Sequence, residues 1–148
     1  MKWLLDTNVV SESVHRRPNQ RVLNWISQRP PPLIVISVVT MAELRWGARI
    51  TIDPRRRIEL TRWIEQQVEP AFADYTLPLS VDILIEWLEV TRRRSMTGRT
   101  QSPADLLIAA TARVHDVIIV TRNVRDFVGT GVLVYDPWNG KTHQMDQA

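Results

Sequence analysis

Two short apolar runs constrain the fold of this chain more than any other feature. Residues 33–37 read Leu-Ile-Val-Ile-Ser and residues 117–121 read Val-Ile-Ile-Val-Thr, and neither run alternates apolar with polar side chains. A strand without alternation is buried on both faces, which is typical of a parallel sheet covered by helices on its two sides. Residues 3–5 and 132–135 predict two more strands, and residues 75–79 predict a weaker one.

Amphipathic segments separate the predicted strands. Apolar residues recur at helical spacing within 22–26, 60–68 and 83–91, and the Ala-rich stretch 104–114 permits close packing on a sheet. Strands that alternate with helices predict a single α/β domain with a central, mostly parallel sheet flanked by helices. We expect this domain to span residues 1–138 and the polar residues 139–148 to form a loose C-terminal tail.

Composition narrows the possible classes of function. The chain has no cysteine and three histidines, so disulfides, thiolate chemistry and a zinc site are not expected. No apolar run approaches the roughly 18 residues of a membrane span, and Asp6 interrupts the N-terminus before a secretory signal core could form. A soluble cytoplasmic protein is the expectation. The net charge of +3 and the predominance of Arg over Lys favour a polyanionic partner.

Four acidic residues stand where the predicted strands meet the predicted helices. They are Asp6, Glu43, Asp105 and Asp126. Each has a purely structural interpretation when it is taken alone. Residues 102–105 and 40–43 have the pattern of helix starts with capping boxes, Asp6 can cap the helix after the first strand, and Asp126 can be a surface turn residue.

Taken together, the four acids predict a metal site. The carboxyl ends of parallel strands gather at one edge of a sheet, and ligands bind there at a switch point in the strand order. Two like charges about 5 Å apart repel by about 3 kcal/mol at an effective dielectric constant of about 20. Carboxylates meeting there must therefore protonate or recruit a cation, and oxygen ligands without His or Cys favour Mg²⁺ or Mn²⁺. Such an ion suits the hydrolysis of phosphodiesters.

The same residues lie in a set of ordered motifs. They read LLDTNVVSE at residues 4–12, TMAEL at 40–44 followed by Gly47, AD at 104–105 followed by IAATA at 108–112, and VTRN at 120–123 followed by DF at 126–127 and GV at 131–132. In order and spacing this set resembles PIN-domain ribonucleases, and especially VapC-type toxins of the FitB-like branch. The resemblance covers nearly the whole chain.

The resemblance implies a role for each site residue. Asp6, Glu43 and Asp105 correspond to the three central metal-site acids of the family, and the fourth position falls on Asp126 or on Asn123. Thr121 and Asn8 are expected to lie next to the metal-site acids and to hold them in position. The implied activity is endoribonucleolytic cleavage with Mg²⁺ or Mn²⁺, leaving a 5′-phosphate and a 3′-hydroxyl. The implied partners are RNA, a small antitoxin and a second copy of the chain.

A basic rim is needed to bring RNA to an acidic pocket. Arg92, Arg93, Arg94 and Arg99 precede Asp105 and are the first candidates for it; Arg45, Arg49, Arg122 and Arg125 are further ones. A solvated helix C-terminus explains the run at 92–94 equally simply, because cations there complement the helix dipole. Residues 55–68 are a candidate surface for a partner helix, and the alternative is an ordinary helix that faces the core.

Other readings of the acids remain open at this point. A catalytically silent PIN module that binds RNA or protein would keep the fold without the activity. A receiver-like phosphoacceptor domain also holds Mg²⁺, but it requires an adjacent acidic pair after the first strand and a Lys at a late strand end. A haloacid-dehalogenase-like phosphatase requires Asp-x-Asp, and this chain has Asn8 in the second place.

Overall fold

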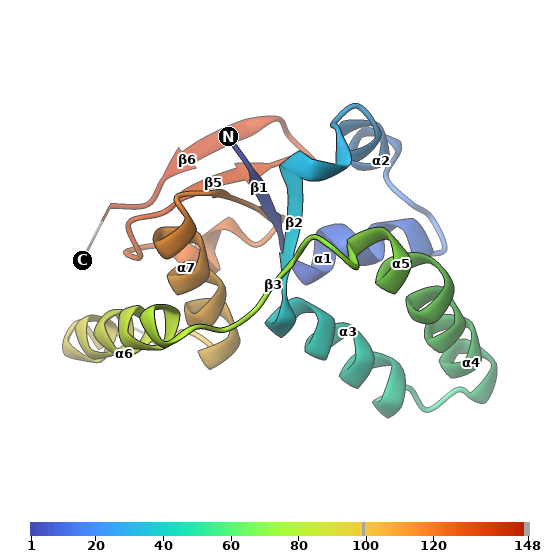
Figure 1. Ribbon diagram of the computed structural model, residues 1–148, viewed down its shortest axis with the longest axis horizontal. Helices are drawn as coiled ribbons and strands as arrows, with labels where there is room; N and C mark the ends of the chain where they lie inside the picture. The colour runs from blue at the N-terminus through green and yellow to red at the C-terminus, as the bar shows by residue number, and fades with distance from the viewer. Residues whose placement is uncertain (99, 147–148) are drawn as a thin grey trace.

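A six-stranded sheet forms the centre of the molecule (Figure 1). The computed structural model describes residues 1–98 and 100–146. The strands lie in the order β3-β2-β1-β4-β5-β6. Their bounds are Trp3–Leu5 for β1, Ile34–Ser37 for β2, Thr76–Leu77 for β3, Ile118–Val120 for β4, Leu133–Asp136 for β5 and Lys141–Gln144 for β6.

The strand order reverses next to β1. The chain first adds β2 and β3 on one side of β1 and then adds β4 and β5 on the other, all in parallel. Strand β1 pairs with β4 so that Leu5 lies opposite Val120. Both strands therefore end at the same place, which is the switch point expected from the sequence. The predicted α/β fold with a mostly parallel sheet is confirmed.

Helices cover both faces of the sheet, which explains why its strands do not alternate. Leu5, Ile36 and Val120 belong to a core cluster on one face, whereas their neighbours Leu4 and Ile119 belong to a cluster on the other. The first cluster is covered by the helices α1 (Thr7–Val10), α2 (Gln20–Ser27), α3 (Val38–Ile50) and α4 (Pro54–Trp63), followed by the π-helical turn η3 (Ile64–Val68). Three shorter segments complete this half of the chain: η1 (Ser11–Val14), η2 (Pro31–Leu33) and α5 (Glu69–Phe72).

The second face is covered by α7 (Pro103–His115), and α6 (Val81–Met96) packs against the outside of α7. Figure 1 shows these two helices on the opposite side of the sheet from α4 and α5. Small residues let α7 approach the sheet closely, since Ala109 and Ala112 are buried in the second cluster. A short 3-10 helix, η4 (Val124–Phe127), follows β4 and buries Phe127 in the same cluster.

The segment 139–148 is not a loose tail, so that prediction is wrong for its described part. Residues 141–144 form β6, which pairs antiparallel with β5. Gly140 reverses the chain with a φ of +76°, and the buried Met145 donates its backbone N–H to Val132 O at 2.9 Å. An edge strand with one face in solvent needs few apolar residues, so the polar sequence of these residues did not predict β6. Residues 147–148 lie outside the described part of the chain.

Within residues 1–98 and 100–146, no helix is long and apolar enough to cross a membrane.

Candidate metal centre at the carboxyl edge of the sheet

Asp6 is the central acid of the site. It directly follows β1, is 6% exposed, and donates its backbone N–H to Val120 O at 2.9 Å, which keeps it in register with β4. Its Oδ1 accepts the Thr7 N–H at 2.8 Å, so it caps α1 as the sequence predicted. Burial raises the pKa of Asp6, and the hydrogen bond from Thr121 opposes this rise, while the charges of Glu43 and Asp126 add to it.

Thr121 and Asn8 hold the Asp6 carboxylate from behind. The fully buried Thr121 hydroxyl donates to Asp6 Oδ2 at 2.8 Å and accepts from Asn8 Nδ2 and from the Asn123 N–H, both at 3.0 Å. One donated and two accepted bonds are the full capacity of a hydroxyl group. Asn8 Nδ2 also contacts Asp6 Oδ2 at 3.2 Å, and Asn8 Oδ1 accepts the Arg122 N–H at 3.1 Å. Both residues lie where the resemblance indicated.

Glu43 reaches the site from the second turn of α3. The Thr7 hydroxyl donates to Glu43 Oε1 at 2.9 Å and so joins α1 to α3. The Glu43 side chain is exposed at the rim, and partial shielding of its carboxyl raises the pKa of Glu43; the Thr7 bond opposes this and the charge of Asp105 adds to it.

The capping-box alternative for residues 40–43 is wrong. Ser37 caps α3 by accepting the Val39 N–H at 3.0 Å, so the helix begins at Val38. Thr40 is buried within it. Glu43 is therefore not needed at a helix start.

Asp105 stands at the start of α7. Ser102 is the N-cap of this helix: its Oγ accepts the Asp105 N–H at 3.1 Å and donates to Asp105 Oδ2 at 2.6 Å. The predicted helix start with Pro103 at the first position is confirmed. Asp105 is half-buried, and this burial raises the pKa of Asp105; the Ser102 bond opposes the rise, and the charges of Asp126 and Asp6 add to it.

Asp126 and Asn123 both lie on the segment that follows β4. Asp126 is in η4 and is near enough for its charge to raise the pKa of Asp6 and of Asp105. The exposed Asn123 precedes η4 and is fixed through its backbone bond to Thr121. Gln101 Nε2 donates to the backbone oxygens of Asp126 and Val128 and thereby fastens this segment to the loop before α7. Sequence reasoning missed Gln101, which belongs to no motif.

The donor chemistry of the site fits Mg²⁺ or Mn²⁺. Asp6, Glu43, Asp105 and Asp126 offer only oxygen ligands, and burial together with the charges of neighbouring acids raises the pKa of Asp6, Glu43 and Asp105. In the described part of the chain, however, no three His, Asp or Glu side chains are already arranged around a common ion position. Asp6, Glu43 and Asp105 each bond a neighbouring hydroxyl instead. That these acids hold a single ion stays a prediction.

Comparison with known proteins decides the family. The PIN domain model matches residues 3–131. This chain belongs to the PIN domain family.

Similar PIN domains with 32 to 33% identity are known. Toxin FitB of Neisseria gonorrhoeae is 32% identical over 92% of this chain and 98% of its own length. The VapC ribonuclease Y4jK of Sinorhizobium fredii is 33% identical over 91% of this chain and 96% of its own length. A solved structure of FitAB bound to an IR36 DNA fragment superposes with a TM-score of 0.85 at 31% identity, covering 96% of this chain and 99% of that one. The predicted resemblance is confirmed, and the family match leaves no support for the receiver-like and dehalogenase-like readings.

Three of the four first candidates for the basic rim lie in the described part of the chain, and each is engaged within helix α6 or the interior. Arg92 pairs with Glu89 at 2.7 Å, and Arg93 lies 3.7 Å from Glu86. Arg94 is only 3% exposed, so the prediction that it belongs to an exposed rim is wrong: helix α6 turns it toward the interior instead of toward solvent. Arg99 lies outside the described residues.

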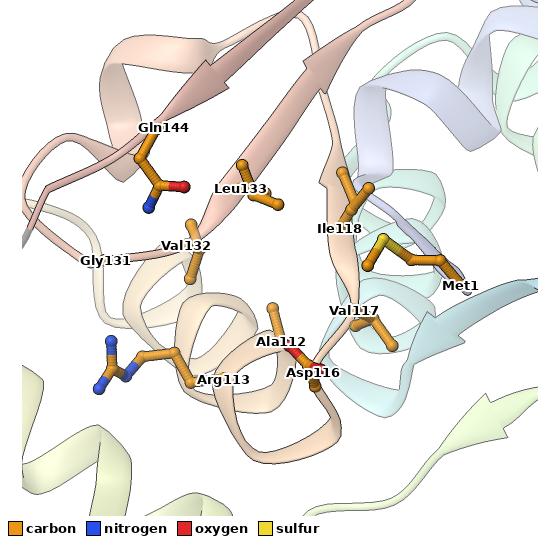
Figure 2. Close-up of a pocket in the computed structure, with 10 residues that line it drawn as sticks. All are labelled: Met1, Ala112, Arg113, Asp116, Val117, Ile118, Gly131, Val132, Leu133 and Gln144. Carbon is orange, nitrogen blue, oxygen red and sulfur yellow. The ribbon is translucent and has the colours of Figure 1, made fainter.

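A cavity at the opposite edge of the sheet is lined by none of the four candidate metal-site acids. This cavity of about 340 Å³ lies between the C-terminal end of α7 and the starts of β4 and β5 (Figure 2). Its polar lining includes Arg113, Asp116 and Gln144, and Arg113 already bonds Glu86 and Thr130 O. The candidate chemistry is therefore at the carboxyl edge, not here.

Proposed function

We propose that this chain is the endoribonuclease toxin of a toxin–antitoxin pair and hydrolyses RNA phosphodiester bonds in the cytoplasm. Asp6, Glu43, Asp105 and Asp126 would hold Mg²⁺ or Mn²⁺, with Asn123 as the alternative fourth residue. The observation that carries the proposal is the placement of four acids at the carboxyl edge of a PIN domain, where burial and the charges of neighbouring acids raise the pKa of Asp6, Glu43 and Asp105. The ribonuclease name of a relative that matches over nearly the whole chain supports it.

Each side chain has a distinct part in this mechanism. Mg²⁺ or Mn²⁺ held by these carboxylates would supply Lewis-acid stabilisation of the leaving oxygen and an activated water, and the products would be a 5′-phosphate and a 3′-hydroxyl. Hydrogen bonds from Thr121 and Asn8 hold the Asp6 carboxylate in place, so Asp6 is the fixed acid of the site. Glu43 and Asp105 bond hydroxyl groups at the rim and can turn inward when positive charge arrives. Burial disfavours the charged form of both carboxylates, and a cation held between them would stabilise that form.

The test compares two neutralised site residues with a matched control. Asp6→Asn and Asp105→Asn should each abolish Mg²⁺- or Mn²⁺-dependent cleavage of RNA while circular dichroism shows a retained fold. Asp116→Asn removes the same charge at the opposite edge, at a left-handed position (φ 50°) that Asn tolerates, and should cleave like the wild type. Full cleavage by either site variant would refute the mechanism, and an inactive wild type would indicate a silent PIN module.

The partners follow from the toxin assignment. The solved relative FitAB binds a DNA fragment as a complex, which supports an antitoxin partner for this chain as well. Helix α6 supports a homodimer: opposite the stripe that packs on α7 it exposes Val81, Ile85 and Leu88, of which Ile85 and Leu88 are 59% and 60% exposed. A second copy of α6, packed antiparallel, would cover this stripe and bring its acidic first half beside the basic second half.

A further inference from the structure

Two adjoining hollows extend away from the acidic residues. The first, of about 760 Å³, is lined by Asn123 and Asp126 of the candidate metal centre and reaches Asn139 in the turn after β5. The second, of about 730 Å³, follows β6 to Asp146. They share Val124, Arg125 and His143 and so adjoin between η4 and β6, and we name the two together the η4–β6 groove.

The two arginines of the groove are available to a ligand. Arg122 and Arg125 are exposed, and within residues 1–98 and 100–146 neither forms a salt bridge. The Arg122 guanidinium lies over the Trp138 ring, 5.4 Å from its centroid. A stacked guanidinium keeps its N–H edge free for a planar fork to phosphate. Arg92 and Arg93, in contrast, each pair with a glutamate.

The groove is connected rigidly to the acids. Asn8, which bonds Asp6, also fixes the Arg122 backbone, and Thr121 fixes the Asn123 backbone. The backbone that carries Arg122 is therefore fixed relative to Asp6. Contacts that a substrate makes outside its reacting group place the scissile bond at the site of an enzyme.

The rest of the lining also fits a polar ligand. His143 lines both hollows, and its Nε2 is a buried atom without a hydrogen-bond partner in the described structure. An unsatisfied buried nitrogen is costly unless a water or a ligand bonds it. The acid Asp136 is 7% exposed and bonds the Trp138 N–H at 2.8 Å, so part of its charge is already compensated.

We propose that the η4–β6 groove binds the single-stranded RNA segment next to the scissile bond, with Arg122 and Arg125 each contacting a phosphate. This inference rests on the proposed ribonuclease function. Each hollow has a volume in the range of pockets that hold small organic ligands, which suits single nucleotides of an unpaired strand. RNA is read mainly in such unpaired segments.

The test measures RNA binding without cleavage. A fluorescein-labelled single-stranded RNA of mixed sequence is titrated in EDTA, and its anisotropy gives the Kd for the wild type, Arg122→Ala/Arg125→Ala and Arg16→Ala/Arg17→Ala. The control pair removes the same charge from exposed positions that line neither hollow. We expect the groove variant to raise Kd about tenfold or more, and its slope of log K against log salt to fall by about 1.4, the value for two lost phosphate contacts on a single strand.

Two further measurements make the result decisive. Arg122→Lys/Arg125→Lys keeps the charge without the fork and should restore part of the affinity. With Mn²⁺ and the same RNA, the alanine pair should raise KM more than it lowers kcat. Equal losses in both alanine pairs, or an unchanged Kd in the groove variant, overturn the inference even if wild-type RNA cleavage stands. A wild type that neither binds nor cleaves RNA overturns the proposed function itself.

Discussion

Removing the Thr121 hydroxyl should destabilise the protein and disable the site at the same time. Thr121→Val keeps the volume but deletes three hydrogen bonds of a fully buried hydroxyl: one to Asp6 Oδ2, one from Asn8 Nδ2 and one from the Asn123 N–H. A bond to a charged group contributes about 1.5–3 kcal/mol and a neutral one about 1 kcal/mol. Allowing for non-additivity, we expect the free energy of unfolding to fall by about 2–4 kcal/mol at pH 7.

The loss should depend on pH with a definite sign. Burial already raises the pKa of Asp6, and the Thr121 bond holds that rise down. For an acid whose folded pKa is raised, stability is fully present below the unfolded pKa of about 4 and is lost as pH rises through the folded value. Without the hydroxyl the pKa of Asp6 in the folded protein rises further, so the variant loses more stability than the wild type between pH 4 and pH 7. We expect the deficit to be smaller by about 1 kcal/mol at pH 4.

Urea unfolding of metal-free protein at the two pH values measures both effects. Thr111→Val is the matched control, because Thr111 is equally buried but donates only to Leu107 O of its own helix; it should cost less than about 1 kcal/mol. Thr121→Ser retains the hydroxyl and should retain most of the stability. Two results would falsify this account of the network. One is a free energy of unfolding for Thr121→Val within about 0.5 kcal/mol of the wild type, the level of a surface substitution; the other is a loss of stability that is equal at both pH values.

Three other predictions concern the metal, the interface and the edge strand. Mg²⁺ at 100 times its Kd should stabilise the wild type by about 2.7 kcal/mol in thermal unfolding. The Asp6→Asn variant should respond little, because it lacks one metal ligand and the charge repulsion that the ion relieves. An equal gain in stability in both proteins would place the ion elsewhere. Leu88→Glu, which puts a charge in the exposed stripe of α6, should shift the protein from dimer to monomer in light scattering, while Glu59→Gln on exposed α4 should not; an unchanged dimer would rule out this stripe as the interface. Met145→Ala should lower the free energy of unfolding by about 2–4 kcal/mol because the side chain is buried, and a neutral result would mean that β6 adds nothing to the core.

Much of the fold was predictable because its signals are local. The non-alternating runs at 33–37 and 117–121 became the buried strands β2 and β4, and the Ser102 cap began α7 as expected. Strand β6 escaped prediction because an edge strand needs no apolar pattern, and its pairing partner is fixed only by the reversal at Gly140. The start of α3 was also missed, since Ser37 and Thr40 are both plausible caps and only the end of β2 selects Ser37.

The sequence by itself determined the kind of site: acids at strand–helix junctions, without Cys and with few His, in the order of a PIN domain. Only the tertiary structure decided which groups contact one another. It made Thr121 the hydroxyl that holds Asp6, and it buried Arg94 while leaving Arg122 and Arg125 exposed. The physical reason is distance: residue type and spacing fix local backbone geometry, whereas hydrogen bonds, burial and charge pairing depend on neighbours that are more than 100 residues away in the chain, such as Asp6 and Thr121.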